Sequence, residues 1–138
     1  MSIHAELHPL HLAAVSSRAQ VITGRVLSGI AVLFLLFDAI GKLLRPAAVV
    51  DGTAQMGWPV DVILPLGILQ VAMLIAYLTP RTAVLGAIVW TGYLGGAVAA
   101  HVRIGNPLFS HILFPVYVAA LLWGGLWLRD RRVRNLLQ

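Results

Sequence analysis

The chain has 138 residues, 59% of them hydrophobic and only 11% charged, whereas a soluble domain averages about 25% charged residues. A soluble fold of this length could not bury so much apolar surface, so the composition indicates an integral membrane protein. The absence of cysteine excludes disulfides and thiolate metal sites. The net charge of +5 does not indicate nucleic-acid binding, because four of the ten basic residues stand together near the C-terminus, at Arg129, Arg131, Arg132 and Arg134.

Residues 1–21 are polar to mildly amphipathic and predict a short surface helix or a frayed tail, in which His4, His8 and His11 share one helical face and could bind a metal adventitiously. Four apolar segments follow, each near the ~20 residues that a spanning helix needs. The predicted spans are 22–44, 61–79, 82–101 and 107–128, before a basic tail at 129–138. Only the loops 45–60 and 102–106 have appreciable length. An all-α fold is predicted, a membrane-spanning antiparallel four-helix bundle.

Capping residues and prolines support these helix boundaries. Asp61 is placed to cap the second helix, Thr82 follows a tight turn as the next N-cap, and Asn106-Pro107 opens the fourth helix with a cap and a proline. Two prolines are predicted to lie inside spans, where each leaves a backbone carbonyl in need of another partner, at Pro65 and Pro115.

Small residues recur four apart on three of the predicted helices, and this spacing allows close backbone approach in lipid. A dimer interface is one interpretation, and packing within the chain is the favoured one. The pairs are Gly24 and Ser28, Gly92 and Gly96 (continued by Ala100), and Ala120 and Gly124.

The distribution of Lys and Arg predicts the orientation. With four spans, both termini and the turn between the second and third spans share one side, which holds seven arginines from Arg18 onward, whereas the other side holds Lys42, Arg45 and Arg103. The positive-inside bias therefore places both termini in the cytoplasm.

Helix direction brings a set of polar side chains to the non-cytoplasmic end at similar depth. Asp38 and Lys42 stand one turn apart with the acid first, which predicts an ion pair. The polar side chains of this set are Asp38, Lys42, His101, Arg103, Asn106 and His111. The purely structural alternative is that the pair neutralises itself, Asn106 only caps, and His101 and Arg103 lie among headgroups. Gln70 and Thr91, in mid-span, are secondary candidates and favour interhelical hydrogen bonds.

Three chemistries fit this set. A quinone or a similar lipophilic redox ligand needs hydrogen-bond partners and a titratable relay, for which Asp38, His101 and His111 are the candidate proton-transfer residues. The candidate ligand-binding residues are Lys42, Gln70, Arg103 and Asn106. A metal held by two histidines and a carboxylate is disfavoured because the spacing matches no metal motif. Bis-histidine haem is disfavoured further, since it would lie close to water.

At these residues the chain resembles the DoxX-like family of small four-helix bacterial membrane proteins. The matching stretches are LFLLFDAIGKLL, YLTPRTAVLGAIVWTGYLGGAVAAHVRIGNPLFSHILFPVY and WGGLWLRD, between Arg25 and Asp130. The resemblance implies a multi-pass protein of the bacterial inner membrane with a loose association with redox chemistry, including partner oxidoreductases. Relatives often carry glutamate at position 70 and aspartate at position 106, so Gln70 and Asn106 depart from the family by losing an acid.

Two functions follow as competing hypotheses. The first is a membrane component of redox metabolism that binds a quinone-like or other lipophilic small molecule near the non-cytoplasmic end. The alternative is a non-catalytic membrane anchor or assembly subunit for a partner oxidoreductase. Beyond the lipid bilayer, the expected partners are the small molecule, an oxidoreductase or a second copy of the chain, with no nucleic acid. Whether the protein is itself catalytic stays open, and a transporter is disfavoured because no inverted repeat is evident.

Overall fold

The computed structural model describes the backbone of residues 3–136 and the side chains of residues 17–136. The predicted histidine face at His4, His8 and His11 therefore lies outside the described side chains. The elements in chain order are α1 (Ile3–Leu44), α2 (Ala47–Gln55), η1 (Val60–Val62), α3 (Ile63–Leu78), α4 (Ala83–Arg103), η2 (Leu108–Ile112), α5 (Phe114–Arg129) and α6 (Arg131–Leu136).

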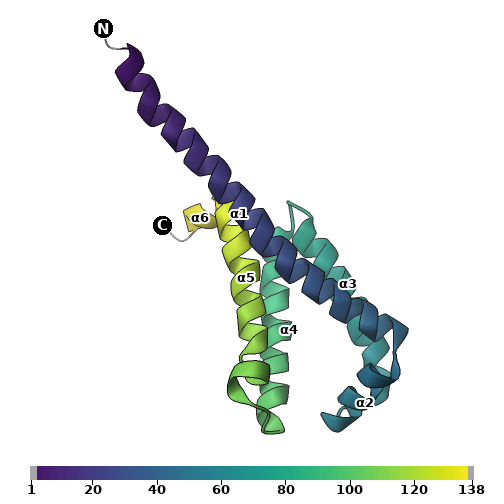
Figure 1. The fold of residues 1–138 in the computed structure, drawn as a ribbon. Helices are drawn as coiled ribbons and strands as arrows, with labels where there is room; N and C mark the ends of the chain where they lie inside the picture. Colours follow the sequence, from purple (N-terminus) through teal and green to yellow (C-terminus); the bar gives the residue numbers. More distant parts are fainter. Residues whose placement is uncertain (1–2, 137–138) are drawn as a thin grey trace.

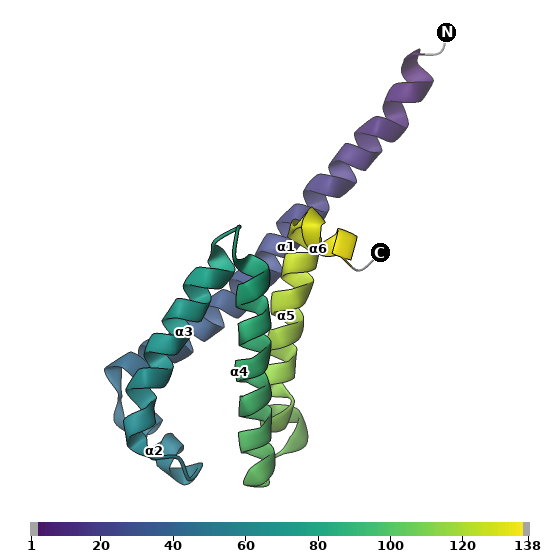
Figure 2. The same cartoon turned by 180° about the vertical axis from the view of Figure 1, so that it is seen from behind.

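The four long helices pack antiparallel, with α1 against α3 and α5, and α4 against α3 and α5 (Figures 1 and 2). The predicted all-α four-helix fold is confirmed. The helices give four candidate membrane spans, Ser17–Leu44, Val60–Leu78, Ala83–Arg103 and Leu108–Arg129. At most 33% of any of the four apolar windows is buried inside the protein. The remaining apolar surface needs a lipid solvent, so the helices contact a bilayer.

We call the two ends of the bundle the α2 end and the α6 end. The α2 end holds α2, η1, η2 and the C-terminus of α4, whereas the α6 end holds α6 and the turn between α3 and α4 (Figure 1). α1 stops at the α2 end because Arg45 adopts a left-handed conformation (φ 54°) and Pro46 follows it. The predicted loop at 45–60 instead contains helix α2, which has no buried residue.

A buried tyrosine links the helices of the core through hydrogen bonds. Tyr77 on α3 is fully buried, and its hydroxyl donates to the Leu122 carbonyl of α5 at 2.7 Å. The same hydroxyl oxygen lies 2.9 Å from Ser28 Oγ of α1, which therefore donates to it. One side chain thus joins three helices. Trp90 on α4 is also fully buried.

The predicted small-residue packing is confirmed for α1 and wrong for α4. Gly24 on α1 lies so close to α5 that an added Cβ would be 2.7 Å from the Gly125 carbonyl oxygen. The partner on α5 is therefore Gly125 rather than the predicted Gly124. On α4, Gly92 and Gly96 are exposed, and an added Cβ would meet no atom within 4 Å.

Two of the three predicted helix starts need correction, and the third is confirmed in its position. Asp61 lies in η1 and does not cap α3, whose N-cap residue is Val62 without a side-chain bond. Thr82 does occupy the N-cap position of α4, but its hydroxyl donates backwards to the Ala76 carbonyl at 2.8 Å. Asn106-Pro107 opens a π-helical turn, η2, instead of the fourth α-helix.

Both prolines that were predicted inside spans lie in first helical turns. Pro115 is among the first residues of α5, after η2, and Pro65 is the third residue of α3. Backbone donors in a first turn have no intrahelical acceptor, so proline costs little there. Both prolines therefore lie within candidate spans, as predicted, but at the start of a helix rather than in its interior.

Candidate functional site

The predicted ion pair at the α2 end of α1 is confirmed. Lys42 Nζ donates to Asp38 Oδ2 at 2.5 Å. The same carboxylate oxygen accepts a second bond, from Gln70 Nε2 of α3 at 2.6 Å. The side chain of Asp38 is 41% exposed and that of Lys42 18%, whereas Gln70 is fully buried. The acid therefore links two helices and still presents surface to its surroundings.

Close packing of α1 on α3 places Gln70 within reach of Asp38. Gly67 lies one helical turn before Gln70, and a Cβ added there would be 3.0 Å from Lys42 Cβ. The missing side chain lets α3 approach α1 next to the ion pair. Gln70 then donates through Nε2, which leaves its Oε1 buried and without a hydrogen-bond partner. An unpaired buried acceptor is costly, and a donor from a ligand or a water would satisfy it.

The two histidines lie together at the same end of the bundle. The ring centroids of His101, on α4, and His111, on η2, are 5.8 Å apart in an edge-to-face arrangement. Asn106 Nδ2 lies 2.7 Å from His101 Nδ1. Because an amide nitrogen only donates, His101 accepts at Nδ1 and carries its proton on Nε2. His111 Nδ1 lies 2.8 Å from Ser110 Oγ, a neighbour that the sequence had not singled out.

Arg103 closes the α2 end rather than facing the histidines. Its Nη2 donates to the Met56 carbonyl oxygen, and its guanidinium lies 5.6 Å from the centre of the Trp58 ring. Gly57, between those two residues, has a positive φ of 73° that turns the chain around the arginine. The contact ties the C-terminus of α4 to the segment that follows α2. Trp58 is half-exposed and takes part in this contact, which we call the Arg103 clasp.

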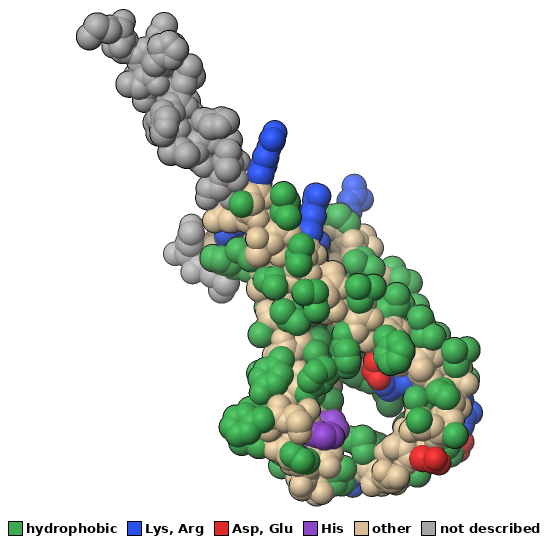
Figure 3. Space-filling view, in the orientation of Figure 1, with side chains coloured by type: hydrophobic (Ala, Val, Ile, Leu, Met, Phe, Trp, Pro, Cys, Tyr) green, Lys and Arg blue, Asp and Glu red, His purple; other side chains and the backbone are tan. Residues whose placement is uncertain are grey.

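An opening runs through the molecule near the α2 end (Figure 3). Figure 3 shows histidine atoms on one edge of it, with acidic and basic atoms on the opposite edge. Helices α1 and α3 diverge from α4 and η2 toward the α2 end (Figures 1 and 2), and the Arg103 clasp spans the gap at the end itself. The opening therefore faces the sides of the bundle, where the apolar exterior meets lipid.

The predicted site residues separate into two clusters. Asp38, Lys42 and Gln70 form one through direct bonds, and His101, His111 and Asn106 form the other. In the described part of the chain no hydrogen bond joins the two clusters, and no group of three potential ligands stands ready for a metal. The other mid-span candidate, Thr91, accepts a bond from Trp123 Nε1 at 2.8 Å and so joins α4 to α5.

Four apolar helices with a divided polar cluster near one end define a small multi-pass α-helical membrane protein. Residues 26–125 match the sequence model of the DoxX-like family, and the chain belongs to this family. No curated protein and no solved structure shows significant similarity to the chain. The match begins in α1 and ends in α5, so it includes every residue of both clusters.

Proposed function

We propose that this protein is a component of redox metabolism in the bacterial inner membrane, and that it binds a quinone-like molecule in the opening near the α2 end. The proposal rests on an opening near the α2 end with histidine atoms on one edge and acidic and basic atoms on the other (Figure 3), and on the two polar clusters that lie at this end of the bundle. A quinone is an apolar ring with oxygens on opposite sides. It can enter from lipid and place one oxygen at each cluster.

The side chains present suit the two ends of such a ligand. Lys42 offers donors on the α1–α3 side to a quinone oxygen, which accepts hydrogen bonds. The proton on His101 Nε2 offers a donor on the α4 side. Quinone reduction takes up protons together with electrons, and histidine and aspartate are the groups that can deliver protons. We infer that electrons come from a partner oxidoreductase, which is the partner that this proposal requires.

Ligand binding provides the test. Decylubiquinone is expected to raise the Tm of the detergent-purified protein by several degrees, because a ligand that binds only the folded state stabilises it. The rise should be lost in Asp38→Asn and in His101→Leu, and retained in Asp51→Asn. Asp51 is an exposed acid on α2 at the same end of the bundle, so it controls for a change in charge. An equal rise in Asp38→Asn, His101→Leu and the wild type would refute the site.

A second candidate function rests on a specific feature of the same site. The Asp38 carboxylate is already neutralised by Lys42 and bonded by Gln70, as expected of a cluster that serves only to hold α1 against α3. No change in Tm with decylubiquinone, together with copurification of an oxidoreductase, would favour the membrane anchor or assembly subunit.

The orientation forms part of the proposal: both termini face the cytoplasm and the opening lies toward the periplasm. Arg129, Arg131, Arg132 and Arg134 oppose transfer of the α6 end across the membrane. A C-terminal green fluorescent protein fusion is therefore expected to fluoresce, and a C-terminal alkaline phosphatase fusion to be inactive. Active phosphatase at the C-terminus would reverse the orientation.

A further inference from the structure

The α6 end holds a cavity of about 290 Å³ that the proposed quinone site does not use. It lies between α1, the turn between α3 and α4, and the C-terminal end of α5. Three cations and one anion line it, namely Arg25, Arg129, Arg132 and Asp130. The lining is therefore positively charged at the depth where a bundle meets lipid headgroups.

Arg129 is the cation whose hydrogen bonds are incomplete. Its Nε and one of its terminal nitrogens, Nη2, are buried, and neither has a hydrogen-bond partner among the residues that the structure describes. The guanidinium carbon lies 5.1 Å from the centre of the Tyr77 ring, which supports one face of the group without accepting a conventional hydrogen bond. Buried donors on a charged group are costly unless an acceptor meets them. An acceptor from a ligand or from water would satisfy these donors, and an anionic oxygen would also neutralise the charge.

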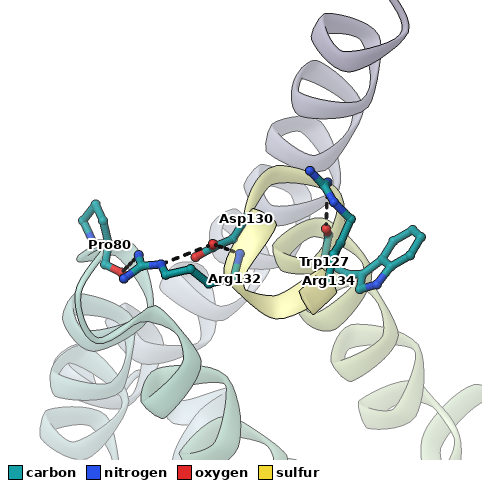
Figure 4. Close-up of polar contacts among 5 residues, drawn as sticks. All are labelled: Pro80, Trp127, Asp130, Arg132 and Arg134. Atoms are coloured by element: carbon teal, nitrogen blue, oxygen red, sulfur yellow. Dashed lines mark hydrogen bonds and ion pairs between the residues drawn. The ribbon is translucent and has the colours of Figure 1, made fainter. Parts of the chain in front are cut away.

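The neighbouring acid does not supply that oxygen. Asp130 Oδ1 accepts the backbone N–H of Arg132 at 2.9 Å, at the start of α6, and lies 3.5 Å from Arg132 Nε (Figure 4). Arg132 also donates to the Pro80 carbonyl at 3.0 Å. Asp130 is therefore bonded to Arg132, and Arg132 is bonded to Asp130 and to the α3–α4 turn. Arg25 and Arg129 remain as the pair that an incoming anion would contact.

A second cavity, of about 190 Å³, adjoins the first and shares two of its three arginines, Arg25 and Arg129. Its other lining residues are Ser28, Gly29, Val32 and Leu78, and the surface that lines this cavity is mostly apolar. Val32 lies seven residues beyond Arg25 on α1, which is about 10 Å farther into the span. The first cavity is basic and the adjoining second cavity is apolar. Together they suit an amphiphile with an anionic headgroup and an apolar chain.

We propose that these two cavities bind one phosphate-bearing anion, with its phosphate at Arg25 and Arg129. The apolar groove along Val32 and Leu78 assigns the ligand to an anionic phospholipid, whose acyl chain occupies the second cavity. Arginine is suited to this role because its planar fork of donors pairs with phosphate oxygens. Free phosphate shares the headgroup chemistry and lacks the chain. The site is independent of the quinone proposal because it lies at the opposite end of the bundle.

The experiment compares ligands on the full-length protein in detergent by native mass spectrometry and by thermal unfolding. The ligands are phosphatidylglycerol, phosphatidylcholine with the same acyl chains, and inorganic phosphate. Phosphatidylglycerol is expected to remain bound and to raise Tm more than the other two. Arg25→Gln and Arg129→Gln should each weaken its binding about tenfold, the loss expected for a charge-assisted hydrogen bond.

Arg81→Gln is the matched control, because Arg81 is an exposed arginine of the α3–α4 turn that does not line either cavity. Arg129→Lys is the second test variant, for the case that Arg129→Gln does not fold, because it keeps the positive charge. We expect Arg129→Lys to bind phosphatidylglycerol more weakly than the wild type does. Equal binding of phosphatidylcholine, or an equal loss in Arg81→Gln and Arg25→Gln, would overturn the site. Full stabilisation by inorganic phosphate alone would support the phosphate contacts and overturn the assignment to lipid.

Discussion

Gly125→Ala is expected to destabilise the bundle by about 1–3 kcal/mol, the usual cost of overpacking, whereas Gly124→Ala is expected to be neutral or stabilising. A Cβ at position 125 would lie 2.7 Å from the Ser28 backbone nitrogen and 2.8 Å from the Gly24 carbonyl oxygen. Backbone atoms cannot rotate away, so α1 and α5 must separate. At position 124 the nearest atom is Leu27 Cδ1 at 3.9 Å, an ordinary contact.

The pair of variants separates packing from helix propensity. Alanine favours a helix over glycine by up to about 1 kcal/mol at both positions, so propensity alone predicts that both variants gain stability. Thermal unfolding of the purified proteins in one detergent measures the difference. Separation of α1 from α5 should also weaken the bond between Ser28 and Tyr77. Equal Tm values for the two variants would show that α1 and α5 do not meet at Gly125.

Asp38→Ala is expected to cost about 2–3 kcal/mol, the range for hydrogen bonds to a charged group, and more than Asp38→Ala combined with Lys42→Met. The single change leaves Lys42 without its counter-ion and Gln70 Nε2 buried without an acceptor. Removing the cation as well relieves the first of these penalties, so the two substitutions should couple by about 0.5–3 kcal/mol.

The measurement is a double-mutant cycle on unfolding free energies, with Asp51→Ala as the control. Asp51 is an exposed acid on α2, and its replacement should change stability by no more than about 0.5 kcal/mol. Additive effects of the two single changes would mean that Asp38 and Lys42 do not act as a unit. A third variant, Gln70→Leu, separates the contribution of the second bond to Asp38.

The features that were predicted correctly depend on short sequence separations. The Asp38–Lys42 pair follows from the helical repeat, since residues four apart share a face. The meeting of His101 and His111 follows from the short connection at 102–106, which forces its two flanking segments to lie side by side. In both cases the partners are brought together by local geometry alone.

The features that were missed depend on how each helix is rotated about its axis. Gly24 contacts Gly125 rather than Gly124, and the stripe at Gly92 and Gly96 faces outward. A one-residue difference rotates a side chain by about 100° around a helix. Nearly every residue of these spans is apolar, so hydrophobic periodicity does not identify the inward face.

The polar contacts between distant segments show the same limit. Three contacts join residues more than 30 positions apart in the sequence. They are the bond from Gln70 to Asp38, the contact of Arg103 with Met56 and Trp58, and the packing of Arg129 against Tyr77. In the sequence, Arg129 is simply the first residue of the basic tail at 129–138. Arg129 comes close to Arg25 only because α1 packs against α5, and no sequence spacing predicts this.

The sequence by itself determined the membrane class, the four spans and the local pairs, because bilayer thickness and the helical repeat constrain each segment independently of the others. Only the tertiary structure decided which faces meet, where the helices diverge, and which charged groups remain without partners. In lipid these choices depend on close steric fit and on a few hydrogen bonds between helices. Both are properties of pairs of surfaces, which appear only when the helices are packed together.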